Sequence, residues 1–162
     1  MVLARNRKTA DLLTKAFREH TLKKTYLALV RGVPAKEYGE IKAPLEKADG
    51  RVQVLEGGKP AVTEYQVLDC VSDKYALLAA SPLTGRTHQI RAHLEFIGTP
   101  ILGDGKYFGT DREKSGMFVH KLHLHAYKID LSSVYGRKLI VQAKLPGYFK
   151  DSLSTLGLNF RG

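Results

Sequence analysis

The chain has 162 residues, 43% of them hydrophobic, which is enough for one buried core, and no shift in composition divides it, so we expect a single domain over residues 1–162. We find neither an apolar run long enough to span a bilayer nor a secretory signal, which excludes membrane-spanning and secreted classes and favours a cytoplasmic protein. The 26 basic and 16 acidic residues give a net charge of +10, which favours a polyanionic partner, most simply RNA.

The first 24 residues hold seven basic side chains and only two acidic ones. Within them, residues 9–20 carry Ala10, Leu13 and Phe17 at helical spacing, which predicts an amphipathic helix capped by Thr9. Its basic side suits phosphates, with an affinity that falls as salt rises. The alternative is a solvated, solubilising helix face. The residues expected to contact RNA here are Arg5, Arg7, Lys8 and Lys24.

Strand-like segments follow. Residues 24–31 place Tyr26, Ala28 and Val30 on one face and Leu27 and Leu29 on the other, which predicts a central strand covered on both sides. The lone cysteine, Cys70, is expected to be a small buried hydrophobe without a disulfide partner. Further strands are predicted at 39–44, 51–55, 61–70 and 75–80.

The second half alternates one helix, one loop and two more strands. Residues 87–97 predict a helix whose apolar stripe is Ile90, Leu94 and Ile97, and the glycine-rich stretch 104–118 predicts a mobile surface loop that touches RNA. Strands at 123–131 and 138–145 and a closing helix at 148–157 complete the chain. Strands outnumber helices and turns are short, so we expect an α+β fold with a mixed, mainly antiparallel sheet.

The run LTGRTHQIRAHL at residues 83–94, followed by GTPILGD at 98–104, closely resembles the RluA-type pseudouridine synthases. The resemblance implies an enzyme that isomerises uridine to pseudouridine in structured RNA, on a mixed sheet with an RNA-binding cleft and without a metal or organic cofactor. The segment KLHLHA at 121–126 and the C-terminal residues resemble members that act on large-subunit (23S) ribosomal RNA.

The same resemblance implies a catalytic Asp in a motif HRLD, upstream of a strand that ends like MVLAR. Here MVLAR stands at residues 1–5, and HRLD occurs nowhere in the 162 residues. We therefore expect a truncated catalytic domain that is inactive alone, or, alternatively, a non-catalytic RNA-binding remnant. An unpaired Arg91 and an exposed sheet edge would follow, and the edge predicts self-association.

Two catalytic residues carry over by position. Tyr26, in KTYLALV, resembles the tyrosine of the family's site that stacks on the extruded uracil, and its alternative is a sheet-core aromatic. Arg91 resembles the arginine that pairs with the catalytic carboxylate, and its alternative is a helix-surface charge.

The start of the 87–97 helix offers free backbone amides and an arginine fork, which suit a phosphate. We expect RNA contacts from Arg86, Thr87, His88 and Gln89, with a structural role for His88 as the alternative.

A metal site is the rival interpretation of the histidines, but the sequence has neither CxxC nor HExxH spacing and we expect none. The histidines concerned are His88, His93, His120, His123 and His125. Asp104 follows the motif and is not expected to replace the nucleophile.

Overall fold

A computed structural model describes residues 2–108 and 121–162. Its helices are α1 (Arg7–Arg18), α2 (Gln89–Phe96), α3 (Ser132–Tyr135) and α4 (Gly147–Leu156). Its strands are β1 (Lys23–Arg31), β2 (Tyr38–Lys42), β3 (Leu45–Ala48), β4 (Arg51–Val54), β5 (Val62–Val71), β6 (Tyr75–Pro82), β7 (Leu124–Asp130) and β8 (Ile140–Gln142). The described helices include none that is both long and apolar enough to cross a membrane.

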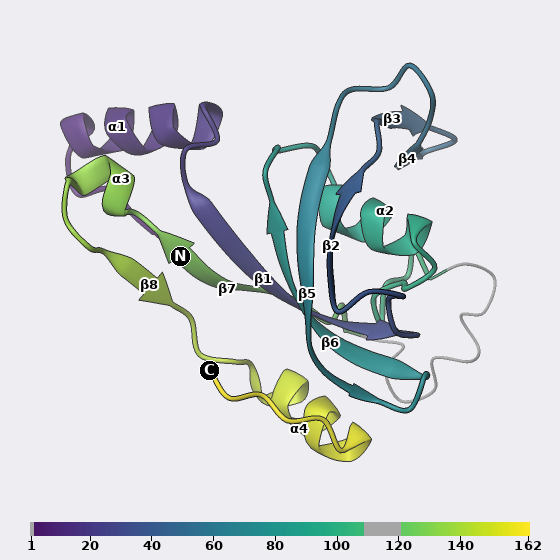
Figure 1. Ribbon diagram of the computed structural model, residues 1–162. Helices are drawn as coiled ribbons and strands as arrows, with labels where there is room; N and C mark the ends of the chain where they lie inside the picture. Colours follow the sequence, from purple (N-terminus) through teal and green to yellow (C-terminus); the bar gives the residue numbers. More distant parts are fainter. Residues whose placement is uncertain (1, 109–120) are drawn as a thin grey trace.

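Six strands form one sheet in the order β2-β5-β6-β1-β7-β8, and every neighbouring pair is antiparallel (Figure 1). The strands β3 and β4 form a separate hairpin. The α+β class with a mainly antiparallel sheet is therefore confirmed. The strand β1 lies between β6 and β7, as its two apolar faces predict.

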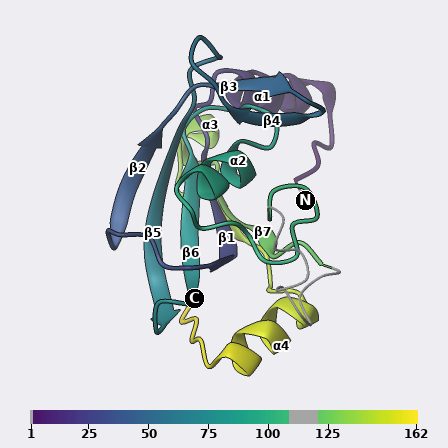
Figure 2. The same cartoon turned by 90° about the vertical axis from the view of Figure 1, so that its right-hand side faces the viewer.

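Side chains alternate across β1 and so divide the core between two faces of the sheet. Ala28 and Val30 pack with Ile90 of α2, whereas Leu27 and Leu29 pack on the opposite face. That opposite face is covered by Phe149 and Leu153 of α4, together with Leu158. Figure 2 shows α2 against the sheet with the β3–β4 hairpin above it and α4 at the lower end.

The helix α1 begins two residues earlier than predicted because Asn6, and not Thr9, caps it. The Asn6 Oδ1 accepts a hydrogen bond of 2.9 Å from the Thr9 backbone N–H. Leu13 and Ala16 are buried, but Phe17, which its spacing places on the apolar side of the helix, is 42% exposed. The buried pair packs against Leu22 of the turn and Leu131 near α3, which ties α1 to the end of β7.

The strand predicted at 51–55 is β4, but its partner β3, and with it the hairpin, was not predicted, and neither was the short helix α3. The hairpin turns at Asp49 and Gly50, both with positive φ (50° and 73°), and Asp-Gly is a dipeptide typical of such turns. The Asp49-Gly50 dipeptide was therefore a signal in the sequence for the turn between β3 and β4. The strand predicted at 138–145 is reduced to residues 140–142.

Cys70 is exposed, which contradicts the predicted burial. The register of β5 against β6 shifts between Val67 and Asp69, so Cys70 pairs with Ala76 and does not continue the exposed face of Glu64 and Gln66. It is exposed near the end of the strand, and its apolar character alone did not predict this.

Candidate active site

The turn before α2 is fixed to the sheet by Gln89, whose side chain is only 4% exposed. Its Oε1 accepts hydrogen bonds from Thr84 Oγ1 (2.7 Å) and the Arg86 backbone N–H (3.0 Å). Its Nε2 donates to the Val62 carbonyl (2.8 Å) and to Thr63 Oγ1 (3.0 Å). Both halves of the amide are used inside the protein, so the predicted RNA contact of Gln89 is corrected to a structural role.

The next site residue, His88, adopts a left-handed conformation (φ +51°) at the N-terminal end of α2 and makes no side-chain cap bond. Its Nδ1 lies 3.0 Å from the hydroxyl of Tyr107. Burial lowers the pKa of His88, and the positive charges of Arg91 and Lys106 lower it further, against an opposing effect of Asp104. A non-glycine residue held in this conformation is the kind of strain found at functional sites.

Arg91 has a partner, which corrects the expectation that it is unpaired. Its Nε and Nη2 each donate a 2.7 Å hydrogen bond to the Asp104 carboxylate, whose side chain is fully buried. This bond raises the pKa of Arg91. Asp104 also accepts the backbone N–H groups of Lys106 and Tyr107 at 3.0 and 3.1 Å. Such bidentate, charge-assisted pairs fix the guanidinium in direction as well as in charge.

Tyr107 is the residue of this site that the sequence reasoning missed. It is fully buried, and its ring centre lies 4.7 Å from the Arg91 guanidinium carbon. Its hydroxyl accepts the backbone N–H of Val52 in β4 at 3.1 Å. The adjacent Phe108 is also buried, so Asp104, Tyr107 and Phe108 are not part of a surface loop, although Gly105 and Lys106 between them are exposed. Residues 109–118 lie outside the described residues. The aromatic pair inside GDGKYFG was the signal that could have found Tyr107 and Phe108.

The β3–β4 hairpin completes the outer side of the site. Arg51 Nη2 lies 3.3 Å from Glu95 Oε1 of α2, and both side chains are about one-third exposed. Together with the Val52 bond to Tyr107, this pair holds the hairpin against α2.

Tyr26 projects toward the same side of the sheet as α2. It is half-buried and packs against the core cluster that contains Ile90 and Leu94. Burial raises the pKa of its phenol, so it stays protonated near neutral pH. The structure thus brings Tyr26 and the Arg91 helix to one face, but no hydrogen bond joins the two side chains among the described residues. Their catalytic roles stay predictions.

The predicted RNA contacts outside α2 are mostly exposed. Arg5, Arg7 and Lys8 are exposed at the start of α1, and Thr87 and Arg86 are exposed in the turn before α2. The Arg86 Nε donates to the Pro60 carbonyl at 3.2 Å, which leaves the other guanidinium N–H groups outward.

Lys24 is the exception, since it is half-buried and its Nζ lies 5.9 Å from the centre of the Phe17 ring. Burial lowers the pKa of Lys24. The two basic regions meet through Gly85, where a Cβ atom would collide with the ring of His20 at the end of α1.

The buried histidines are committed to structural hydrogen bonds. The His93 ring contacts Thr63 Oγ1 (2.8 Å) and the Ala43 carbonyl (3.0 Å). The His123 ring contacts the Leu102 carbonyl (3.2 Å) and Ser152 Oγ (2.8 Å). Across residues 2–108 and 121–162, no group of three metal-ligating side chains gathers, and His120 lies outside that part of the chain. The metal interpretation gains no support there.

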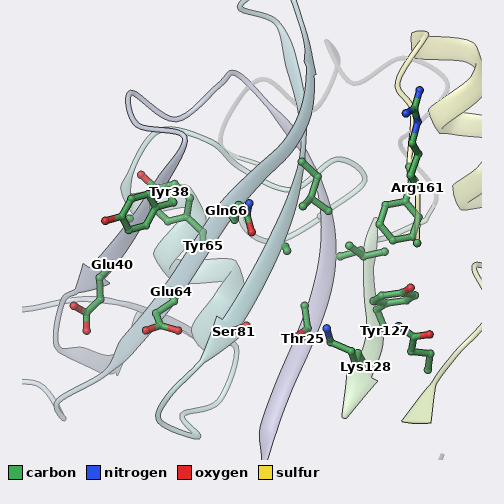
Figure 3. Close-up of a pocket in the computed structure, with 17 residues that line it drawn as sticks. Thr25, Tyr38, Glu40, Glu64, Tyr65, Gln66, Ser81, Tyr127, Lys128 and Arg161 are labelled. Atoms are coloured by element: carbon green, nitrogen blue, oxygen red, sulfur yellow. The ribbon is translucent and has the colours of Figure 1, made fainter. Parts of the chain in front are cut away.

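A pocket of about 840 Å³ lies on the sheet face away from α2 (Figure 3). Its walls include Leu27 and Tyr127, which belong to or pack on the cluster beneath α4, and the outward side chains of Glu64 and Gln66. This pocket is therefore separate from the face that carries α2 and Tyr26.

The chain is similar to known RNA-modifying proteins over almost all its length. The family model for RNA pseudouridylate synthase matches residues 1–96. Ribosomal large subunit pseudouridine synthase C of Rickettsia bellii is 38% identical over 155 residues, which cover 92% of this chain and 50% of that protein. An uncharacterized RNA pseudouridine synthase of Zymomonas mobilis is 34% identical over 93% of this chain and 69% of its own.

A solved structure of human RNA pseudouridylate synthase domain containing 4 superposes with a TM-score of 0.82 at 30% identity, covering 100% of this chain and 72% of that one. The chain spans about half the length of its Rickettsia relatives. Because the family model matches more than half of its residues, and the fold agrees with a solved member, the chain belongs to the RNA pseudouridylate synthase family.

Proposed function

We propose that this chain forms the RNA-binding and arginine-bearing part of a cytoplasmic enzyme that isomerises uridine to pseudouridine in large-subunit ribosomal RNA. The observation that carries the proposal is the Arg91 guanidinium, held by Asp104 at the helix whose sequence resembles the family motif. The ribosomal substrate is supported by the names of the Rickettsia and Vibrio cholerae relatives, which are ribosomal large subunit pseudouridine synthases.

The geometry of Arg91 suits it to hold a second carboxylate. A guanidinium has five N–H groups. Asp104 uses two of them, one on Nε and one on Nη2, which leaves three for a catalytic Asp. Because Asp104 fixes the plane of the guanidinium, the remaining donors are already oriented, and their charge would keep that Asp ionised.

In the proposed reaction the bond between the uracil N1 and the ribose C1′ breaks, the base rotates, and C1′ bonds to C5. The C5 proton leaves and N1 gains one, so the atoms balance without an oxidant. The target uridine must first leave its stack. We propose that Tyr26, neutral and half-buried on the α2 side, stacks on the extruded base.

The proposal assigns the nucleophile to residues outside this span, because the 162 residues contain no HRLD motif. The span alone is therefore proposed to be inactive. That same observation favours a second candidate, a non-catalytic RNA-binding module. Self-association through an edge of the sheet, β2 or β8, is part of the proposal and is checked by light scattering.

Tritium release from RNA labelled at uracil C5 tests the function. The 162-residue chain is compared with a longer chain that includes an HRLD motif and with the same longer chain after Asp→Ala in that motif. We expect release only from the intact longer chain, and loss of it in its Arg91→Lys variant, since lysine lacks the bidentate fork. Tritium release from the 162-residue chain would overturn the assignment of the nucleophile. If no chain released tritium, the non-catalytic RNA-binding module would be the remaining candidate.

A further inference from the structure

The hydroxyl of Tyr107 lies within hydrogen-bond distance of two nitrogen atoms, the Val52 backbone N and His88 Nδ1. These two contacts determine which nitrogen of the His88 ring carries a proton. The Val52 backbone N–H, 3.1 Å away, can only donate, so the phenol oxygen accepts from it. The phenol has one proton of its own to donate. Among the described residues, the acceptor within hydrogen-bond distance is His88 Nδ1, at 3.0 Å. The proton of Tyr107 therefore points to Nδ1, and Nδ1 carries none.

The other protonation states of His88 fit the site less well. A proton on Nδ1 would leave the Tyr107 proton without an acceptor in a fully buried position. A doubly protonated ring would do the same and would add a positive charge beside Arg91 and Lys106, which already lower the pKa of His88. The one carboxylate that opposes them, Asp104, is engaged with Arg91. His88 is therefore neutral, with its proton on Nε2.

The ring of His88 is also fixed in direction. It meets Tyr107 edge-on, with ring centres 5.6 Å apart and planes at 90°. Because Nδ1 faces Tyr107, Nε2 faces away from it, and within the described part of the chain Nε2 has no hydrogen-bond partner and is not a buried atom. The result is an outward N–H donor at the start of α2, beside the exposed side chains of Arg86 and Lys106.

We propose that Tyr107 locks His88 as the Nε2–H tautomer, and that this N–H donates to a phosphate oxygen of the bound RNA. The inference rests on the proposed function for its RNA. A phosphate is the acceptor that the cationic neighbours favour, because they attract an anion to the same place. His88 is then a binding residue, and Tyr107 is a positioning residue that acts through it.

Two substitutions of His88 separate a donor role from a structural one. In His88→Gln the side-chain amide reaches the Nε2 position, whereas in His88→Asn it reaches only the Nδ1 position. Asn tolerates the left-handed backbone better than Gln does. A structural role therefore predicts rescue by Asn, and a donor role predicts rescue by Gln.

The binding experiment uses the full chain and fluorescein-labelled RNA hairpins with loops of uridine or of adenosine. We expect His88→Gln to bind within about twofold of the unaltered protein, and His88→Asn to lose roughly tenfold to a hundredfold in affinity, the value of one hydrogen bond to a charged group. The loss should be equal for both loops, because a phosphate carries no base identity. Rescue by Asn, or a loss confined to the uridine loop, would overturn the phosphate contact.

Nitrogen-15 NMR of the imidazoles tests the tautomer without RNA. The unaltered protein should show His88 with the proton on Nε2, and Tyr107→Phe, which keeps the ring beside Arg91, should release it to a mixture and weaken RNA binding by roughly twofold to fivefold. A proton found on Nδ1 would refute the inference with the proposed function intact. Failure of the unaltered protein to bind either hairpin would refute the proposed function and the phosphate contact, and would leave the tautomer as measured.

Discussion

The start of α2 and the helix α1 are both basic and both predicted to bind RNA, but they are built differently. At α2 the side chain of Arg91 is 18% exposed, and its guanidinium is paired with a buried carboxylate and lies over the ring of Tyr107. At α1, the exposed side chains are Arg5, just before the helix, and Arg7 and Lys8 in a first turn that carries no acidic residue. The Arg91 site therefore has a fixed geometry, whereas the basic residues at α1 supply positive charge in no fixed orientation.

This difference separates two tasks in binding RNA. Exposed cations gain affinity by releasing counterions from phosphates, and this gain needs no particular orientation. A buried, bidentate ion pair gains little net stability from its charges but fixes a group in one direction, which is what a reacting centre needs. The contact of Gly85 with His20 brings the turn before α2 close to the segment that follows α1.

The largest effect is expected from breaking the buried pair. Asp104→Asn removes the charge that balances Arg91 and exchanges an acceptor for a donor facing it, so we expect the free energy of unfolding to fall by about 3–5 kcal/mol. Urea denaturation measures it. The matched control is Asp73→Asn, at an exposed turn carboxylate, which should change little. A loss below about 1 kcal/mol at Asp104 would contradict the structural weight given to the pair.

Acid should weaken the interior beside α2 and beside α4, where the rings of His93 and His123 make their hydrogen bonds. His93 and His123 are buried, and burial lowers the pKa of each ring in the folded state below its ordinary value. The unfolded chain thus takes up protons first, so this stability is complete above the unfolded pKa near 6.5 and is lost as pH falls below it. The loss is at most about 1.4 kcal/mol per pH unit for each ring.

Thermal unfolding between pH 7.5 and 5.5 checks the acid effect. His93→Gln should reduce the slope of stability with pH although it also lowers stability at pH 7.5. A slope that is the same in both proteins would exclude His93 as a source.

Removing charge from α1 should lower affinity without lowering stability. A triple variant should bind RNA roughly tenfold more weakly at moderate salt. It combines Arg5→Ala, Arg7→Ala and Lys8→Ala. The slope of log affinity against log salt should become shallower by about 0.7 to 0.9 for each phosphate that the protein no longer neutralises. Fluorescence anisotropy over a salt series measures both. The matched control replaces three exposed lysines distant from α1: Lys36, Lys74 and Lys150. An equal effect of the control would show that only net charge matters.

The smallest effect concerns the cap of α1. Asn6→Ala removes the acceptor of the Thr9 backbone N–H and should cost about 1 kcal/mol, whereas Asn6→Asp should keep the bond. Asn159→Ala, at an exposed position whose side chain makes no described bond, is the control. If the cap also orients Arg5 and Arg7, Asn6→Ala will weaken RNA binding as well. That result would show that the basic residues at α1 also depend on orientation, as those at the Arg91 site do.

Local pattern predicted the elements well and their surroundings poorly. The spacing of Tyr26, Ala28 and Val30 predicted a central strand because alternation depends only on backbone geometry. Cys70 was placed in the core on its apolar character, although it is exposed near the end of β5, beyond a register shift that no local pattern predicted. The exposure of Phe17 likewise could not be predicted from its spacing, since the apolar contacts of α1 are made with Leu131, more than a hundred residues later.

The sequence by itself determined the family, the mainly antiparallel sheet and the segment that carries Arg91, because these follow from a long motif and from periodicity. Only the tertiary structure decided the partners of that segment. Asp104 pairs with Arg91, Tyr107 lies buried between Val52 and His88, and Gln89 turns inward. The physical reason is that burial and proton positions depend on atoms brought together from distant parts of the chain, and residue type alone does not specify which atoms those are.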